Sequence, residues 1–328
     1  MQNNTLRQVR SQLDFSKRAY LWVGQILLDV VLAIGIGSAL HSRTTSGIVL
    51  ATLLAPVLYF NSFALMHEAV HRCLTEKLWL NDLLGAVTGT FCFLPYEPWR
   101  QMHLEHHLWA GNVERDPVNK LRKDYSPSHT RKNLILSSIW RSWLPILALL
   151  QHIVFWTYLF QYFEKKALHR GRGFSFIASY AIPVVVYGSV IWWGAKYFPL
   201  VSLVPGIFLY LVLVEFVNLP HHLDLPTTRG ETKLALLEQY LIARSAIYPR
   251  WFSRWVLLNF NLHLEHHLFP NLPWHELEKA RALVKPILKE KYNETYGSQW
   301  LRQHRNQPLG LLLAPSDLKE EVQKKLAA

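Results

Sequence analysis

The sequence predicts an all-α integral membrane protein in which four transmembrane helices, in two hairpins, carry a cytoplasmic helical cap with a metal site. Two observations lead to this fold class: long apolar runs almost free of charge, and histidines grouped one helical turn apart. Half of the 328 residues are hydrophobic, and 13 of them are Trp. Several of the runs reach the ~20 apolar residues that a helix needs to cross a bilayer.

Four runs are expected to span the membrane, and short outer loops join them in pairs. Two of these runs contain no charged residue, and the other two contain one each, Asp29 and Glu215. We expect Asp29 to be a hydrogen-bonded packing residue within its span. The proline inside three of the runs is compatible with a membrane helix. The predicted spans are residues 20–40, 47–66, 174–195 and 200–219.

Two further apolar stretches, 78–96 and 134–160, are interrupted by polar residues. A single crossing at 78–96 would place the first two histidine clusters on opposite faces of the membrane. We therefore expect both stretches to form helices in the plane of the interface, with a short hairpin that dips into the membrane as the alternative. The cap is then formed by residues 97–133 and 220–328, and residues 1–328 form one domain.

Charge indicates the orientation. The net charge is +12, and Lys and Arg are dense in 1–19, in 161–173 and near the C-terminus, whereas the outer loops carry one cation each. The positive-inside rule places the dense segments, both termini and the site in the cytoplasm, at a bacterial inner membrane or the endoplasmic reticulum. The basic N-terminus reads as an uncleaved anchor, because no signal-peptidase site follows it. The excess of positive charge suits anionic lipid and an acidic redox partner, and no motif suggests binding to nucleic acid.

The chemistry lies in three histidine clusters. One has the form H-E-x-x-H, and two share the form H-x-x-H-H, so each projects two or three imidazoles from one helix face. Eight such imidazoles, with a ninth from His221 or His222, exceed the four ligands of one zinc and suit two transition-metal ions. Only Cys73 and Cys92 are present, which argues against an iron–sulfur cluster or a disulfide framework. The clustered residues are His67, His71, His103, His106, His107, His263, His266 and His267.

In order and spacing, these clusters resemble the three histidine boxes of the membrane fatty-acid desaturase superfamily. The resemblance covers roughly residues 45–285. It implies four membrane helices under a cytosolic cap, two irons held by the box histidines, and O2 as co-substrate. An N-x-x-x-H element of acyl desaturases is matched by Asn218 and His222, with His221 as the alternative ninth ligand and Asn218 acting through a water. The short first box points to the branch that holds bacterial and plant-type lipid desaturases and carotenoid ketolases.

Carboxylates are expected behind the ligands, since a metal-bound histidine usually donates its second N–H to such a group. Glu215 is the best candidate, because it lies one turn from Asn218 near the bilayer. The other candidates are Glu68, Glu105, Asp116 and Glu265.

The reaction favoured by the resemblance is desaturation of a fatty acyl chain held in an apolar tunnel whose depth is set by Trp and Phe at the span ends. Hydroxylation, carotenoid ketolation and oxidative decarboxylation to a terminal alkene remain alternatives at the same site. Electrons must come from a separate ferredoxin, rubredoxin or cytochrome b5, because the chain has no flavin, haem or cysteine-cluster motif. Two rivals from other classes are an H-E-x-x-H zinc membrane protease, with Glu68 as general base, and a metal transporter.

Overall fold

The computed structural model describes residues 2–119, 130–164, 173–197, 199–231 and 233–318. These residues are mostly helical, with one two-stranded parallel sheet formed by β1 (Ser245–Ile247) and β2 (Glu294–Tyr296). The parts of the expected cap at 120–129 and 319–328 lie outside the described residues. So do the cations at 165–172 on which the expected orientation partly rests, namely Lys165, Lys166, Arg170 and Arg172.

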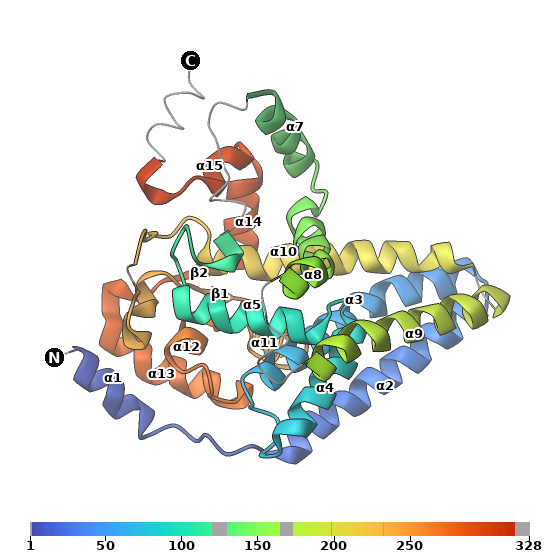
Figure 1. The fold of residues 1–328 in the computed structure, drawn as a ribbon, viewed down its shortest axis with the longest axis horizontal. Helices are drawn as coiled ribbons and strands as arrows, with labels where there is room; N and C mark the ends of the chain where they lie inside the picture. Colours follow the sequence, from blue (N-terminus) through green and yellow to red (C-terminus); the bar gives the residue numbers. More distant parts are fainter. Residues whose placement is uncertain (1, 120–129, 165–172, 198, 232, 319–328) are drawn as a thin grey trace.

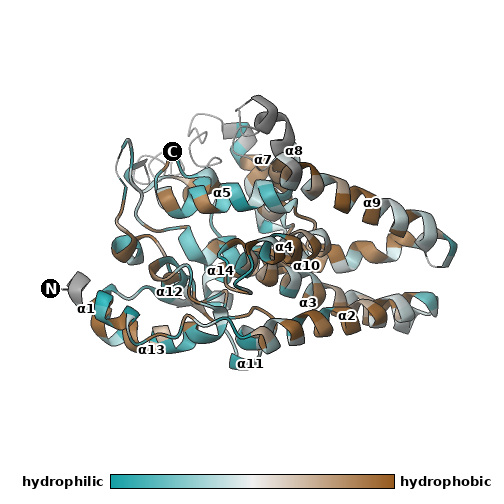
Figure 2. Ribbon diagram, turned by 60° about the horizontal axis from the view of Figure 1, so that its bottom comes forward, coloured by the Kyte–Doolittle hydropathy of each residue, from teal (hydrophilic) through white to brown (hydrophobic). Residues whose placement is uncertain are grey.

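Among the described residues, four helices are long and apolar enough to cross a membrane, as predicted. In each case the helix extends a few residues beyond one or both ends of the expected apolar run. Figure 2 shows hydrophobic residues along the protruding parts of these helices, away from the shorter elements. They are α2 (Ala19–His41), α3 (Thr45–Val70), α9 (Gly173–Tyr197) and α10 (Val204–His222), the last preceded by η3 (Leu200–Leu203).

α3 is the central helix of the four. It packs along α2 on one side and along α10 on another, whereas α9 packs against α4 and α5. The approach of α10 is close because Gly206 faces Ala55, and a Cβ added at this glycine would lie 2.7 Å from the Ala55 side chain. Between α2 and α3, the Ser62 hydroxyl donates to Asp29 at 2.8 Å, which fits the packing role expected of Asp29. Arg43 in the α2–α3 loop donates to the Tyr197 carbonyl at the end of α9.

The stretch 78–96 packs against α3. Near the start of α4 (Leu78–Phe91), Asp82 binds Arg72, just after the end of α3, at 2.6 Å. After α4 ends, the ring of Phe93 lies 4.9 Å from the ring of Tyr59, which is further back in α3. α4 therefore runs back along the last three turns of α3, antiparallel to it. Its 14 residues cover about 21 Å, which is short for a crossing. The chain then continues into α5 (Tyr96–Trp109), and whether these helices lie in the interface or dip into the membrane stays a prediction.

The stretch 134–160 does not form the single helix that we expected. It divides into α7 (Thr130–Arg141) and α8 (Ile146–Glu164), and the axes of Asn133–Arg141 and Ile146–Thr157 differ by 113°. Trp143 adopts a positive φ of 64°, and Pro145 follows before α8 begins. A left-handed residue and a proline both end a helix, so the break has a local cause that the apolar pattern did not indicate.

Shorter elements gather at one end of the long helices, where Figure 1 places both α1 and α15. α1 (Gln2–Arg10) packs against α13 and η4, with Leu6 fully buried. α14 packs on α10. The other short elements are η1 (Pro117–Asn119), η4 (Leu236–Leu241), α11 (Arg250–Trp255), α12 (His263–Leu268), η5 (Trp274–Glu276), α13 (Leu277–Leu288), η6 (Lys289–Lys291), α14 (Gly297–Arg305), α15 (Leu309–Leu313) and η7 (Ser316–Leu318).

Candidate metal centre

The nine histidines favoured from the sequence come together in two groups. Within each group, one ring nitrogen from every histidine lies within 4.8 Å of the others. The five-histidine group consists of His67, His71, His103, His107 and His266, and the four-histidine group consists of His106, His222, His263 and His267. Both H-x-x-H-H boxes divide their histidines between the two groups, so each box helps to build both.

Helix geometry explains this division. α3 carries His67 in its last turn and ends just before His71, so both rings leave the same helix face. α5 turns one face inward with three histidines, while Leu104 and Leu108 on its other face are exposed. α12 is only six residues long and is buried throughout, so both ends of its box face the centre.

α12 is fixed by hydrogen bonds to the small sheet. The buried carboxylate of Glu265 accepts from the Ser245 hydroxyl at 2.6 Å and from the Tyr292 hydroxyl. The Ser245 hydroxyl also accepts from the backbone N–H of Leu264 at 3.1 Å. Because Ser245 begins β1, these bonds join the third box to the sheet. Glu265 therefore orients the helix and makes no hydrogen bond to a ligand, contrary to the role that we expected.

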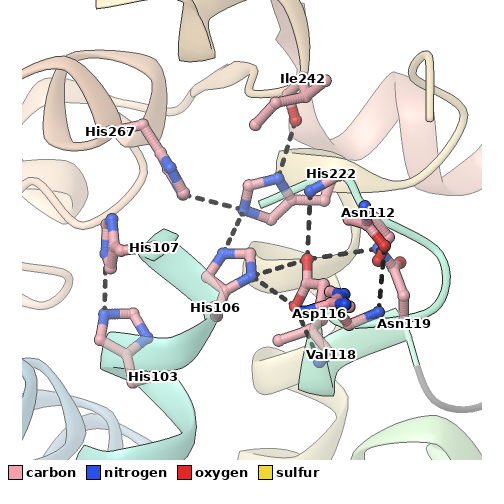
Figure 3. Close-up of polar contacts among 12 residues, drawn as sticks. His103, His106, His107, Asn112, Asp116, Val118, Asn119, His222, Ile242 and His267 are labelled. Atoms are coloured by element: carbon pink, nitrogen blue, oxygen red, sulfur yellow. Dashed lines mark hydrogen bonds and ion pairs between the residues drawn. The ribbon is translucent and has the colours of Figure 1, made fainter. Parts of the chain in front are cut away.

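The contacts of His106 and His222 in the four-histidine group indicate that their Nε2 atoms carry no proton. His106 Nδ1 lies 2.9 Å from the Asp116 carboxylate and His222 Nδ1 lies 2.8 Å from the Ile242 carbonyl, so both Nδ1 atoms are the donors (Figure 3). Each neutral ring then carries only a lone pair on Nε2. Even so, His106 Nε2 lies 3.2 Å from His222 Nε2.

Lone pairs at this distance repel one another unless a cation lies between them. A metal–nitrogen bond of about 2.1 Å places neighbouring ligand nitrogens about 3 Å apart. The five-histidine group has the same spacing, with Nε2–Nε2 distances of 2.8 Å for His71–His103 and 2.9 Å for His107–His266. The residues present therefore fit two metal ions.

At six of the box histidines burial favours the neutral imidazole, which is the form that binds a metal. Desolvation lowers the pKa of His71 to about 3. It also holds the pKa of five other box histidines well below the ordinary value, and neighbouring imidazoles act in the same direction. These five are His103, His107, His263, His266 and His267.

The geometry favours His222 over His221 as the ninth histidine. His222 belongs to the four-histidine group, whereas His221 stacks on His263 with ring centroids 4.1 Å apart and planes at 9°. His221 Nε2 is buried without a hydrogen-bond partner among the described residues. Asn218, one turn before His222, lines the cavity described below.

The carboxylates expected behind the ligands divide into two kinds. Asp116 is the strongest partner, since it accepts from His106 and also from the backbone N–H of Gly111 and Val118 (Figure 3). Glu68 lies 3.7 Å from His67 Nδ1, beyond hydrogen-bond range, and accepts instead from the Trp274 N–H at 3.0 Å.

Glu215 and Glu105 do not support the ligands, and our preference for Glu215 was wrong. The Glu215 carboxylate accepts from the Leu147 N–H at 2.7 Å and from the Arg305 guanidinium. It shares a face of α10 with His222 but lies two turns away, about 10 Å along the axis. Glu105 points outward from α5 and is exposed.

Two partners of the ligands carried no signal in the sequence. The Gln239 side-chain oxygen lies 2.8 Å from His267 Nδ1, and the Gln239 amide donates to the His107 carbonyl at 2.8 Å. The Ile242 carbonyl is the partner of His222. Gln239 lies in η4 and Ile242 directly follows it, so both are outside the two H-x-x-H-H boxes in the sequence. A backbone carbonyl has no residue identity, and Gln239 belongs to no motif.

One apolar cavity reaches both groups. His103 of the five-histidine group lines it, as do three members of the four-histidine group. α10 forms one wall, where Tyr210, Val214 and Asn218 follow one another at four-residue intervals up to His222. Aromatic side chains from other elements complete much of the lining, namely Phe63, Trp99, Phe155 and Phe260.

Comparison with known proteins agrees with this site. The fatty acid desaturase family model matches residues 44–300. An sn-1 oleoyl-lipid 12-desaturase of Picosynechococcus sp. is 26% identical over 243 residues, which cover 71% of this chain and 67% of the relative. An sn-1 acyl-lipid omega-3 desaturase (ferredoxin) of Synechocystis sp. is 24% identical over 323 residues, which cover 90% of this chain and 84% of the relative.

The family match spans most of the chain and includes all three histidine boxes and the ends of α3 and α10 that meet them. The resemblance noted in the sequence is therefore confirmed. The chain belongs to the fatty acid desaturase family and is an oxidoreductase enzyme of the desaturase type.

Proposed function

We propose that the protein is an O2-dependent desaturase of fatty acyl chains carried on membrane lipid, with one iron in each histidine group. The observation that carries the proposal is the convergence of nine imidazoles, eight of them buried, into two groups whose Nε2 atoms lie about one ligand–ligand distance apart. The two relatives described above are named as acyl-lipid desaturases, which supports the lipid substrate.

Two bound irons would supply the activation of O2 that removes hydrogens from an unactivated C–H bond. In the net reaction, two adjacent carbons each lose one hydrogen, and O2 with two electrons and two protons becomes two waters. The chain's own part is to bind and to exclude water. The cavity walls hold an acyl chain beside His103, His106 and His222, and aromatic rings keep bulk water from the reacting carbons.

The geometry weighs against the zinc protease. A catalytic zinc keeps three protein ligands and a water, but His67 and His71 join three further histidines. Glu68, which would have to act as the base, accepts from the Trp274 N–H.

The placement in the membrane and the electron donor form part of the proposal. Both groups lie where α3 and α10 end, and we propose that this end faces the cytoplasm, with the shorter elements as the cap. The electrons would come from a separate carrier. One relative is named as using ferredoxin, so we favour ferredoxin over rubredoxin or cytochrome b5.

The first test is metal content in the full chain, purified in detergent. About two irons per chain are expected. One zinc that survives His263→Ala but is lost in His67→Ala would overturn the proposal in favour of a hydrolase.

The second test is product analysis by mass spectrometry after expression in a lipid-producing host. New double bonds in membrane acyl chains are expected, and they should depend on the nine histidines. Hydroxylated chains, ketolated carotenoids or terminal alkenes in their place would show that the same site performs a different oxidation.

A further inference from the structure

Gln239, which is not one of the nine histidines, makes side-chain hydrogen bonds to a residue of each group. It lies in η4 and is 3% exposed. The side-chain oxygen faces His267 of the four-histidine group, and the side-chain amide donates to the carbonyl of His107 of the five-histidine group, each at 2.8 Å. Neither a histidine box nor any motif in the sequence includes it.

The two bonds of Gln239 determine the state of His267. A carbonyl only accepts, so the amide nitrogen must face His107, and this leaves the amide oxygen to face His267. Since that oxygen also only accepts, the proton of His267 must be on Nδ1. His267 Nε2 is therefore left as a bare lone pair, and it lies 3.1 Å from the Nε2 atoms of both His222 and His263. Gln239 thus selects the tautomer that can bind a metal.

The position of Gln239 is itself supported by the N-terminal helix. α1 packs against η4 and α13 through a buried cluster that contains Leu6, Val9 and Tyr240, the neighbour of Gln239. The amide therefore approaches both groups from a packed element, which is what a positioning residue needs in order to hold two histidines in register.

We propose that Gln239 is a positioning residue that selects the metal-binding tautomer of His267 and fixes the four-histidine group relative to the five-histidine group. This inference rests on the proposed di-iron site. It predicts that loss of Gln239 lowers the metal affinity of the four-histidine group more than that of the five-histidine group.

The test is release of ferrous iron to a chelator from the full detergent-purified chain, followed with Mössbauer spectra of protein loaded with 57Fe. In Gln239→Leu, one of the two irons should leave about 10- to 100-fold faster than in the wild type, and its Mössbauer signal alone should change. Gln25→Leu is the matched control. Gln25 is also buried and accepts from an amide, that of Asn61, but it lies in α2 away from both groups.

Gln239→Glu separates positioning from packing, because it keeps the size of the side chain and an acceptor for His267, while its second carboxyl oxygen can bond the His107 carbonyl only when it carries a proton. It should retain both irons nearly as well as the wild type, even if Gln239→Leu folds poorly. The inference is overturned if Gln239→Glu releases iron as fast as Gln239→Leu, or if Gln239→Leu behaves like Gln25→Leu. A wild-type chain that holds fewer than two irons would instead overturn the proposed function.

Discussion

The two histidine groups differ in what lies behind their ligands. In the four-histidine group, three Nδ1 atoms have partners of graded strength: the carboxylate of Asp116, the amide of Gln239 and the carbonyl of Ile242. The fourth, His263 Nδ1, is buried without a partner among the described residues, as is His107 Nδ1 in the five-histidine group, where His67 Nδ1 has Glu68 at 3.7 Å. For the proposed metal site, we infer that the five-histidine group relies on the number of its histidines and the four-histidine group on how they are oriented.

The difference teaches that the two metals should respond differently to the same kind of change. A group with five ligands can lose one and still offer the four nitrogens that satisfy a tetrahedral metal, whereas a group with four cannot. Conversely, a group whose ligands are oriented by hydrogen bonds should be the one that loses affinity when such a bond is removed.

The largest expected effect comes from removing one ligand in each group. His267→Ala should leave about one iron per chain, while His71→Ala should retain more than one, and both should lower turnover by more than about 100-fold. Iron analysis beside product analysis measures both. Equal loss of iron from the two variants would contradict the comparison.

A smaller effect is expected from the carboxylates. Asp116→Asn should weaken iron binding by about 10- to 100-fold in the four-histidine group, because the strongest acceptor behind His106 is lost. Glu68→Gln should change iron binding much less, since no hydrogen bond joins it to His67. Chelator competition on the two variants would measure the loss of iron affinity in each. A larger loss in Glu68→Gln would show that Glu68, and not Asp116, is the more important carboxylate behind the histidines.

A change in the cavity should leave both groups intact. Tyr210 is fully buried at the far end of the α10 wall, and its hydroxyl donates to the Cys92 carbonyl at 3.1 Å. Tyr210→Ala should move the position of the new double bond along the chain, with iron content unchanged. Mass spectrometry of the products measures the shift. If the double bond keeps its position in both Tyr210→Ala and Phe155→Ala, aromatic side chains do not set the depth of the cavity.

The smallest effect is expected at Asp29, which touches neither group. Asp29→Asn keeps an oxygen that can accept from Ser62, so the change in the free energy of unfolding should stay within about 1 kcal/mol. Thermal unfolding in detergent and iron content would both be measured. A marked loss of iron would show that the α2–α3 contact supports the five-histidine group.

Ligands were easier to predict than their partners. Histidines three and four residues apart share a helix face, so the sequence alone was enough to choose the residues that converge. The partner of a ligand depends on which distant segment packs against it, and this is why Gln239 was missed and Glu215 was wrongly preferred. Glu215 is near the site in sequence, but α8 and Arg305 reach its carboxylate first.

The fold shows the same division. Hydropathy predicted four membrane-crossing helices, because one property of each run decides the matter. The bend between α7 and α8 depends instead on the backbone of Trp143 beside Pro145, which an apolar pattern does not register.

Helix α10 carries both a ligand, His222, and the cavity wall that ends at Tyr210, twelve residues and about 18 Å away. One helix therefore fixes the distance between the proposed metal centre and the far end of the cavity. Because one helix carries both positions, a slide or tilt of α10 moves them together and leaves the distance between them unchanged. A one-residue insertion between positions 211 and 217 would disrupt this arrangement, because it rotates the part of α10 that carries Tyr210 by about 100° relative to His222.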